Sequence, residues 1–255
     1  MKIVLLGAGN VATHLGLRLL QTGADIRQVY SRTDLSAKEL GRLLHVPHCS
    51  DTNLIDKTAD IYIYTIKDSA LSEVASKVQA PKAIHLHTAG SVSMNIFEGY
   101  ANNYGVLYPL QTFSIAKPVD FSQIPLFLEG NNEYTISALT RLAEKLSSVH
   151  YFLSSEDRKK IHLSAVFACN FTNCMYQLAE EIVREAGVPF EVLLPLIWET
   201  ADKVNYISPK EAQTGPAVRN DEQTMLTHIN LLKDNENARN IYLTISEQIK
   251  ELHKK

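Results

Sequence analysis

Two glycines near the start of the chain, Gly7 and Gly9, have the spacing of a phosphate-binding turn. With Ala12 they form a Gly-x-Gly-x-x-Ala pattern, in which the first glycine permits a tight turn and the second lets the backbone approach a pyrophosphate. Asn10 and Val11 would open a helix whose N-terminal N–H groups face that anion. The pattern predicts that these residues bind a dinucleotide. The alternative is a strand-to-helix turn that the glycines only shape.

A hydroxyl, a guanidinium and a second hydroxyl, those of Ser31, Arg32 and Thr33, end the next apolar run. A site that selects NAD would place Asp or Glu near this point to bind the ribose 2′-hydroxyl. Arg32 could instead pair bidentately with a 2′-phosphate, to which the two hydroxyls would donate hydrogen bonds. We therefore expect NADP as the cofactor. The alternatives are a solvated turn arginine and a protein that prefers NAD.

Three polar residues far along the chain, His162, Asn170 and Asn173, fall within about one quadrant of a predicted helix. The stripe is too polar for a core, and a solvated face would usually carry Lys and Glu, so we expect it to face a cleft. His162 is the candidate proton donor because an imidazole titrates near neutral pH. Asn170 and Asn173 would hold the polar atom of a substrate. The alternative is a solvated helix face.

The irregular segment 214–221 brings Thr, Gly, Pro, Arg and Asp close together. Arg219 could bind an anionic or carbonyl group of the substrate there. Equally, Asp221 could cap the following helix while Arg219 pairs with an acid. His228 lies alone in that helix, where a histidine is more often structural than catalytic.

The elements that must position these residues alternate between apolar runs and amphipathic stretches over the first half of the chain. This order predicts a parallel sheet with right-handed crossovers, whose ligands bind beyond the carboxyl ends of the strands. Four such ends, at 7–10, 31–33, 66–69 and 87–91, carry polar residues. We therefore add to the cofactor-binding candidates Lys67, Asp68, His87 and Ser91, the last two as residues that border the nicotinamide.

From Ser154 onward the apolar period becomes helical, beginning with a predicted cap and a helix that extends to about residue 186. Further helices are predicted over 190–204, 222–232 and 236–252. The fold class is therefore α/β, with an N-terminal Rossmann parallel sheet over 1–153 and an all-α C-terminal domain over 154–255.

Composition excludes several classes of partner. The 255 residues are 45% hydrophobic, and 25 basic and 28 acidic side chains give a net charge of −3. The absence of a basic stripe argues against nucleic acid, and the absence of about 18 consecutive apolar residues argues against a membrane span. Three cysteines without a Cys-x-x-Cys pair indicate reduced thiols in the cytoplasm. We predict no metal-binding residues.

Several of these motifs resemble known proteins. The turn at 7–12, the 31–33 segment and Lys67-Asp68 resemble the NADP-dependent group of pyrroline-5-carboxylate reductase, ketopantoate reductase and the β-hydroxyacid dehydrogenases. More specifically, the segments 87–90, 108–113 and 162–170, with Thr214-Gly215-Pro216, Arg219 and Asp221, resemble Rossmann-like proteins with a helical C-terminal domain of unknown function. The resemblance implies an NADP-binding domain and a helical domain that usually builds a homodimer.

The chain departs from these patterns at three places. The dehydrogenases carry a catalytic lysine four residues before an asparagine on the long helix, whereas Val166 and Cys169 stand there in this chain. Tyr108 stands where the more similar family tends to show histidine, and Asn220 where it tends to show glycine.

Two functions follow from the sequence. The first is an NADP-dependent oxidoreductase that transfers a hydride between the nicotinamide and a small carbonyl or imine substrate. The second is a non-catalytic, dimeric NADP-binding sensor or assembly protein, which the missing lysine favours.

Overall fold

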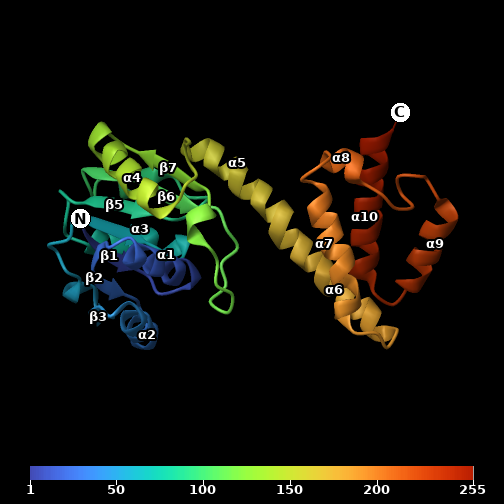
Figure 1. Ribbon diagram of the computed structural model, residues 1–255, viewed down its shortest axis with the longest axis horizontal. Helices are drawn as coiled ribbons and strands as arrows, with labels where there is room; N and C mark the ends of the chain where they lie inside the picture. The colour runs from blue at the N-terminus through green and yellow to red at the C-terminus, as the bar shows by residue number, and fades with distance from the viewer. Residues whose placement is uncertain (255) are drawn as a thin grey trace. The chain divides into compact units, whose positions relative to one another are not determined.

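A computed structural model describes residues 1–254 and divides into two compact units, Met1–Asn170 and Phe171–Lys255 (Figure 1). The first unit is built on an eight-stranded, mostly parallel sheet, and the second is helical. The expected α/β fold class, a Rossmann-type sheet followed by an all-α region, is confirmed. The strands are β1 (Lys2–Leu6), β2 (Asp25–Tyr30), β3 (His48–Cys49), β4 (Ile61–Tyr64), β5 (Ile84–His87), β6 (Asn103–Pro109), β7 (Leu126–Gly130) and β8 (His150–Phe152).

The sheet has the order β3-β2-β1-β4-β5-β6-β7-β8, and β1 is the third strand from one edge, between β2 and β4. One pair departs from the parallel sheet that the sequence predicts, because β6 and β7 are antiparallel. A parallel pair needs a crossover, usually a helix, that carries the chain back along the sheet. The link at 110–125 contains only a short 3-10 turn, Phe121–Gln123, so the chain returns beside β6 in the opposite direction.

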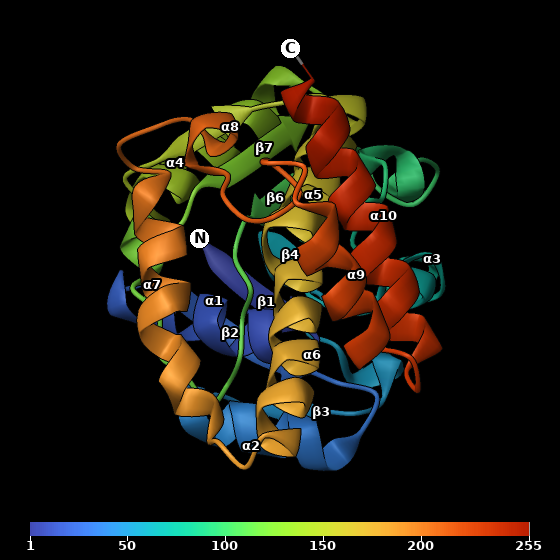
Figure 2. The ribbon, with the colours of Figure 1, turned by 90° about the vertical axis from the view of Figure 1, so that its right-hand side faces the viewer.

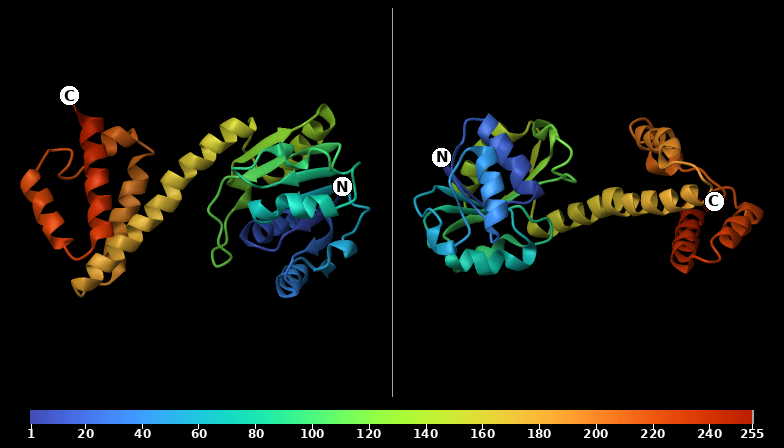
Figure 3. Two further views of the ribbon diagram at one scale, coloured as in Figure 1. Left: turned by 180° about the vertical axis from the view of Figure 1, so that it is seen from behind. Right: turned by 90° about the horizontal axis from the view of Figure 1, so that it is seen from below.

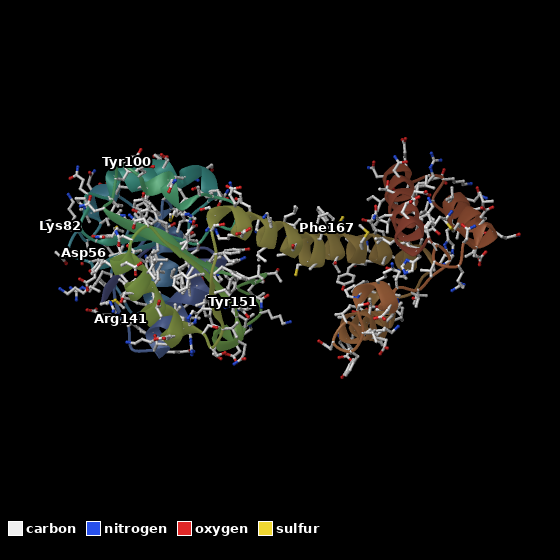
Figure 4. The ribbon with its side chains drawn as sticks, turned by 90° about the horizontal axis from the view of Figure 1, so that it is seen from above. Asp56, Lys82, Tyr100, Arg141, Tyr151 and Phe167 are labelled. Atoms are coloured by element: carbon white, nitrogen blue, oxygen red, sulfur yellow. The ribbon has the colours of Figure 1, made fainter. Side chains whose placement is uncertain are left out.

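Helices cover both faces of the sheet (Figure 3). One core lies under α1 (Asn10–Gln21), α2 (Asp34–Leu44) and α4 (Glu133–Leu146), and a second lies under α3 (Leu71–Lys77). Strands buried on both faces read as continuous apolar runs, which is why they could be recognised in the sequence. Tyr151, labelled in Figure 4, belongs to the edge strand β8 and is 54% exposed.

The long helical segment predicted from Ser154 is interrupted. It consists of α5 (Ser155–Ala165), a π-helical turn (Val166–Phe171) and α6 (Thr172–Glu185). The Ser154 side chain caps α5 by accepting a hydrogen bond from the Asp157 N–H. A π-helical turn changes the angle per residue. The rotation of about 100° per residue, which placed Asn170 and Asn173 on the same helix face as His162, therefore does not hold across this turn.

The second unit contains α6, α7 (Leu194–Lys203), α8 (Pro209–Ala212), α9 (Glu222–Leu231) and α10 (Glu236–His253). Figure 2 shows α9 alongside α10. Nδ1 of His228 lies 2.9 Å from the Tyr242 hydroxyl, so this histidine ties the two helices together. In the described part of the chain, no helix combines the length and apolar character needed to cross a membrane.

Candidate functional site

The glycine-rich turn joins β1 to α1 in the geometry that an anion site needs. Gly7 has φ +128°, and a Cβ there would lie 2.5 Å from Thr65 Oγ1, so both backbone and space require glycine. Gly9 is different, because a Cβ built on it meets no atom within 4 Å. Gly9 is also the N-cap of α1, and no side chain caps that helix. The first N–H groups of α1 can therefore donate to a bound phosphate.

A cavity of about 610 Å³ extends from this turn along the carboxyl ends of β1, β2 and β4. Six of the predicted cofactor-binding residues line it: Gly7, Gly9, Ser31, Arg32, Thr33 and Lys67. The structure therefore brings together two motifs that lie more than 20 residues apart in the sequence. Their shared cavity is open to solvent and lined by both polar and apolar residues.

Cations outnumber anions in the cavity. Arg32, Lys67 and Lys77 line it together with Asp51 and Glu73. Glu73 is held in an ion pair with Lys77, with the two charged atoms 2.6 Å apart. Lys77 was missed by the sequence analysis because it lies within α3 rather than at a strand end. The only signal was its position in the last turn of a helix beside the predicted site.

Four predicted cofactor residues lie near this edge of the sheet without lining the cavity. The Asn10 side chain donates to the Phe113 carbonyl at 2.9 Å, which ties the glycine-rich turn to the 110–125 link. Ser91 donates to the Asp68 carboxylate at 2.7 Å, joining the segments that follow β4 and β5. Val11 is half-buried in the first turn of α1, so only its backbone N–H faces a ligand.

His87 corrects a prediction. Its side chain is fully buried, and its ring packs against Phe97 in the core under α3, with ring centroids 5.8 Å apart. Nδ1 accepts a hydrogen bond from the Ala89 N–H. Burial, together with the positive charge of Arg158, lowers the pKa of His87 to about 3. His87 is therefore a neutral core residue that has no surface to offer a nicotinamide.

His162 lies in α5 against the segment that follows β5. Its Nδ1 is 3.1 Å from the Tyr108 hydroxyl at the end of β6, and the two rings meet edge to face. Gly90 lies beneath both rings, since a Cβ there would be 2.6 Å from His162 Nδ1 and 2.9 Å from Tyr108 Cζ. The half-buried imidazole thus belongs to the carboxyl edge of the sheet. Tyr108 was missed as a site residue, although its place at a strand end could have indicated it.

The same face of α5 holds this segment at two further points. Arg158, one turn before His162, is buried, forms an ion pair with Glu129 of β7 and donates to the Val92 carbonyl. Ser155, near the start of the helix, accepts a hydrogen bond from the Met94 N–H at 3.2 Å. The position of His162 over Gly90 is therefore fixed by a set of contacts along α5.

The other catalytic candidates are exposed. Asn170 ends the first unit, while Asn173 and Arg219 belong to the second. Asp221 caps α9 by accepting from the Thr224 N–H, as the capping alternative for this loop predicts. Asn220 has φ +52°, a left-handed conformation that glycine and asparagine adopt more readily than other residues. Among residues 1–254, no cluster of His, Cys, Asp and Glu could hold a metal ion.

Comparison with known proteins agrees with this geometry. Residues 2–86 match the family model described as NADP oxidoreductase, coenzyme F420-dependent, and residues 124–249 match a domain of unknown function, DUF2520. A crystal structure from Bacteroides fragilis, provisionally named an NADP oxidoreductase, is 44% identical over 98% of both chains, with a TM-score of 0.94. The chain belongs to the same family as this Bacteroides fragilis protein. The expected resemblance to Rossmann-like NADP proteins with a C-terminal domain of unknown function is thereby confirmed.

Solved structures with lower sequence identity share the fold of this chain. A Thermotoga maritima protein is 22% identical over 98% of this chain and 99% of its own, with a TM-score of 0.82. Pyrroline-5-carboxylate reductase from Streptococcus pyogenes is 15% identical over 98% of both chains (TM-score 0.66). A reductive aminase from Aspergillus terreus, in complex with NADPH and ethyl-5-oxohexanoate, is 14% identical over 98% and 92% of the two chains (TM-score 0.74). No curated protein matches the chain.

Proposed function

We propose that the protein is an NADP-dependent oxidoreductase acting on the carbonyl or imine carbon of a small molecule. The observation that carries this proposal is the cavity that joins the uncapped N-terminus of α1 to Arg32. Bound NADPH would supply the hydride. The protein supplies binding, orientation and a proton. Membership of an NADP oxidoreductase family and the NADPH-bound aminase neighbour support the choice of cofactor.

Different residues of the cavity bind different groups of the cofactor. The N–H groups at the start of α1 hold the pyrophosphate, and Gly9 leaves room for it. Arg32 pairs with the 2′-phosphate, to which Ser31 and Thr33 donate hydrogen bonds. Lys67 and Lys77 add positive potential along the same wall.

His162 is the proposed proton donor. Its ring lies at the carboxyl edge of the sheet, and no described residue is hydrogen-bonded to its Nε2. When protonated, it can donate from Nε2 to the oxygen or nitrogen of the substrate. Asn170, which belongs to the same unit, is the proposed donor to the same polar atom. Asn173 and Arg219 of the second unit are proposed as substrate-binding residues in their own right.

One observation favours a second function, that of a non-catalytic NADP-binding sensor. The helix lysine of the resembling dehydrogenases is replaced by Val166 or Cys169, so their proton donor is absent. A protein with only the cofactor cavity could report the NADPH level through binding.

The free thiols of Cys49, Cys169 and Cys174 support a further proposal, that the protein works in the reducing cytoplasm.

One experiment separates these functions. The intact protein is titrated with NADPH and with NADH by fluorescence, and NADPH oxidation is then followed with small keto acids, ketones and cyclic imines. We expect NADPH to bind more tightly than NADH, and one of these substrates to turn over in wild type but not in His162→Ala. Binding without turnover would favour the sensor. No NADPH binding would overturn both proposals.

We also propose that the protein forms a homodimer through its second unit. Among its described residues only four are buried, namely Ala217, Met225, Ala238 and Ser246. Large apolar side chains are exposed along its helices, and these include Ile182, Leu196, Trp198, Leu226 and Leu231. An exposed apolar surface of this kind is typical of a protein–protein interface. In a symmetric dimer, the same helices of a second copy of the chain would cover it.

A further inference from the structure

Tyr108 and His162 form a side-chain pair, and no sequence motif assigns a role to the tyrosine. We propose that Tyr108 is a positioning residue, which holds Nδ1 of His162 so that Nε2 is the ring atom that exchanges a proton with the substrate. This inference rests on the proposed oxidoreductase function. It adds to that function a residue from β6, a strand distant in sequence from the helix that carries His162.

The hydrogen bond accounts for the choice of nitrogen. The Tyr108 hydroxyl lies 3.1 Å from Nδ1, and it has no other hydrogen bond within residues 1–254. In the proposed arrangement the hydroxyl donates to Nδ1 when the imidazole is neutral, because a phenolic O–H is a better donor than acceptor, and the ring hydrogen then resides on Nε2. When the imidazole is charged, Nδ1–H donates to the hydroxyl oxygen instead. Nε2–H is therefore the available donor in both states.

The tyrosine is itself held in place. Its side chain is 9% exposed, and its ring lies near that of Phe127 on β7, with centroids 6.3 Å apart. Burial raises the pKa of the Tyr108 hydroxyl, so it stays protonated and can both donate and accept. Gly90 contacts both rings from below, which leaves neither ring room to turn toward the backbone.

The charged groups around the pair do not compete for Nδ1. Arg158 lies one turn before His162 on α5, but its Nη1 and Nη2 donate to the Glu129 carboxylate and the Val92 carbonyl. His87, on the neighbouring strand β5, is buried, and its Nδ1 is engaged by the Ala89 N–H. The Tyr108 hydroxyl is thus the polar group through which the His162 ring is oriented.

The proton balance of the reaction is simple. Bound NADPH would supply a hydride to the substrate carbon, and the electron pair of the C=O or C=N bond would move to the heteroatom. The heteroatom would take the Nε2 proton of the charged imidazole. That transfer leaves the hydrogen of the neutral ring on Nδ1, which donates it to the Tyr108 hydroxyl oxygen. Nε2 then regains a proton from solvent, and Tyr108 gains and loses no proton over the cycle.

The first test measures the ring itself in the protein without cofactor. Histidine labelled with ¹⁵N reports which nitrogen carries the hydrogen, and His162→Gln identifies the signals of His162. We expect the Nε2–H form in wild type above neutral pH, and a mixture of both forms in Tyr108→Phe. Tyr151→Phe is the matched control, since Tyr151 also packs on Phe127 but is exposed, and its ring makes no bond to His162.

A second variant keeps the test independent of how well Tyr108→Phe folds. Gly90→Ala leaves the tyrosine intact but places a Cβ where Nδ1 lies, so it should displace the imidazole and alter the same ¹⁵N signals. Thermal melts followed by circular dichroism check that each variant is folded. An unchanged Nε2–H form in a folded Tyr108→Phe variant overturns the inference.

The second test measures catalysis once a substrate is found. We expect Tyr108→Phe to lower kcat about 10- to 100-fold with KM nearly unchanged, because the acid is still present but poorly oriented. The pH profile of kcat should also shift, and Tyr108→His should recover part of the rate. If the ¹⁵N signals change but no substrate turns over in wild type, Tyr108 still orients the ring, and it is the proposed oxidoreductase function that fails.

Discussion

Arg158 of α5 and Glu129 of β7 form a buried ion pair, with the arginine side chain 1% exposed and the glutamate 13% exposed. Breaking such a pair leaves one charge buried without a partner. We therefore predict that Arg158→Met or Glu129→Gln lowers the free energy of unfolding by about 3 to 5 kcal/mol. Urea denaturation of each single variant and of the double variant measures this loss, and the double variant should lose less than the sum.

The control for this prediction lies on the same helix. Lys159 pairs with Glu156 at 2.8 Å, but both side chains face water. Lys159→Met should leave the denaturation midpoint unchanged, since exposed pairs contribute little. Equal losses for Lys159→Met and Arg158→Met would contradict the role of burial.

The two glycines of the turn should respond differently to alanine. Gly7→Ala forces a side chain into the left-handed region and against Thr65, so we predict a loss of stability of about 2 kcal/mol or more. Gly9→Ala meets nothing in the protein and should change stability by less than about 0.5 kcal/mol. It should nevertheless weaken NADPH binding at least tenfold. Calorimetry measures both quantities, and full NADPH affinity in Gly9→Ala would exclude phosphate binding at this turn.

Arg32 should select NADP over NAD. Arg32→Ala removes a charge-assisted contact worth about 1.5 to 3 kcal/mol, so the Kd for NADPH should rise about 10- to 100-fold while that for NADH stays the same. Arg27→Ala is the control, because Arg27 lies on β2, the strand that precedes Arg32, but pairs with Asp25 and Asp56 outside the cavity. An unchanged Kd for NADPH in Arg32→Ala would instead favour the alternative of an NAD-preferring protein.

His87 should make the fold sensitive to acid. Its pKa is lowered to about 3 in the folded protein from 6.5, so between these values the unfolded chain binds more protons. Stability is then fully present above pH 6.5 and is lost as the pH falls, by on the order of 2 kcal/mol between pH 7 and pH 5. Burial lowers the pKa of His85 as well, with the same sign. His87→Phe should flatten the dependence of unfolding free energy on pH, and an equal slope in both proteins would argue against this origin.

The second unit should self-associate. Light scattering after size exclusion should give twice the mass of one chain. Leu196→Glu, which places a charge on a 64% exposed apolar position of α7, should shift the protein toward the monomer. Leu35→Glu changes an equally exposed leucine on α2 of the first unit and should not. A monomeric wild type would disprove the dimer.

Local patterns in the sequence were sufficient to predict the strands of the sheet, the glycine turn and the helix caps at Ser154 and Asp221. Each depends on residues that lie within a few positions of one another. Gly7 needs its conformation because of the turn itself, and a buried strand such as β4 is apolar throughout because both of its faces are covered. The antiparallel β7 was not predictable in this way, because the direction of a strand depends on its link and its neighbours.

What the sequence by itself determined is therefore the Rossmann turn, the order of its elements and the segments 7–9 and 31–33 that meet in one cavity. Only the tertiary structure decided which side chains at the strand ends are accessible. His87 is the last residue of β5 and Ser91 lies just beyond it, yet the first is buried under α3 and the second is exposed. Tyr108 and His162 are 54 residues apart, and their pairing depends on how α5 packs over Gly90. Burial and contact arise from packing between distant segments, which no local pattern encodes.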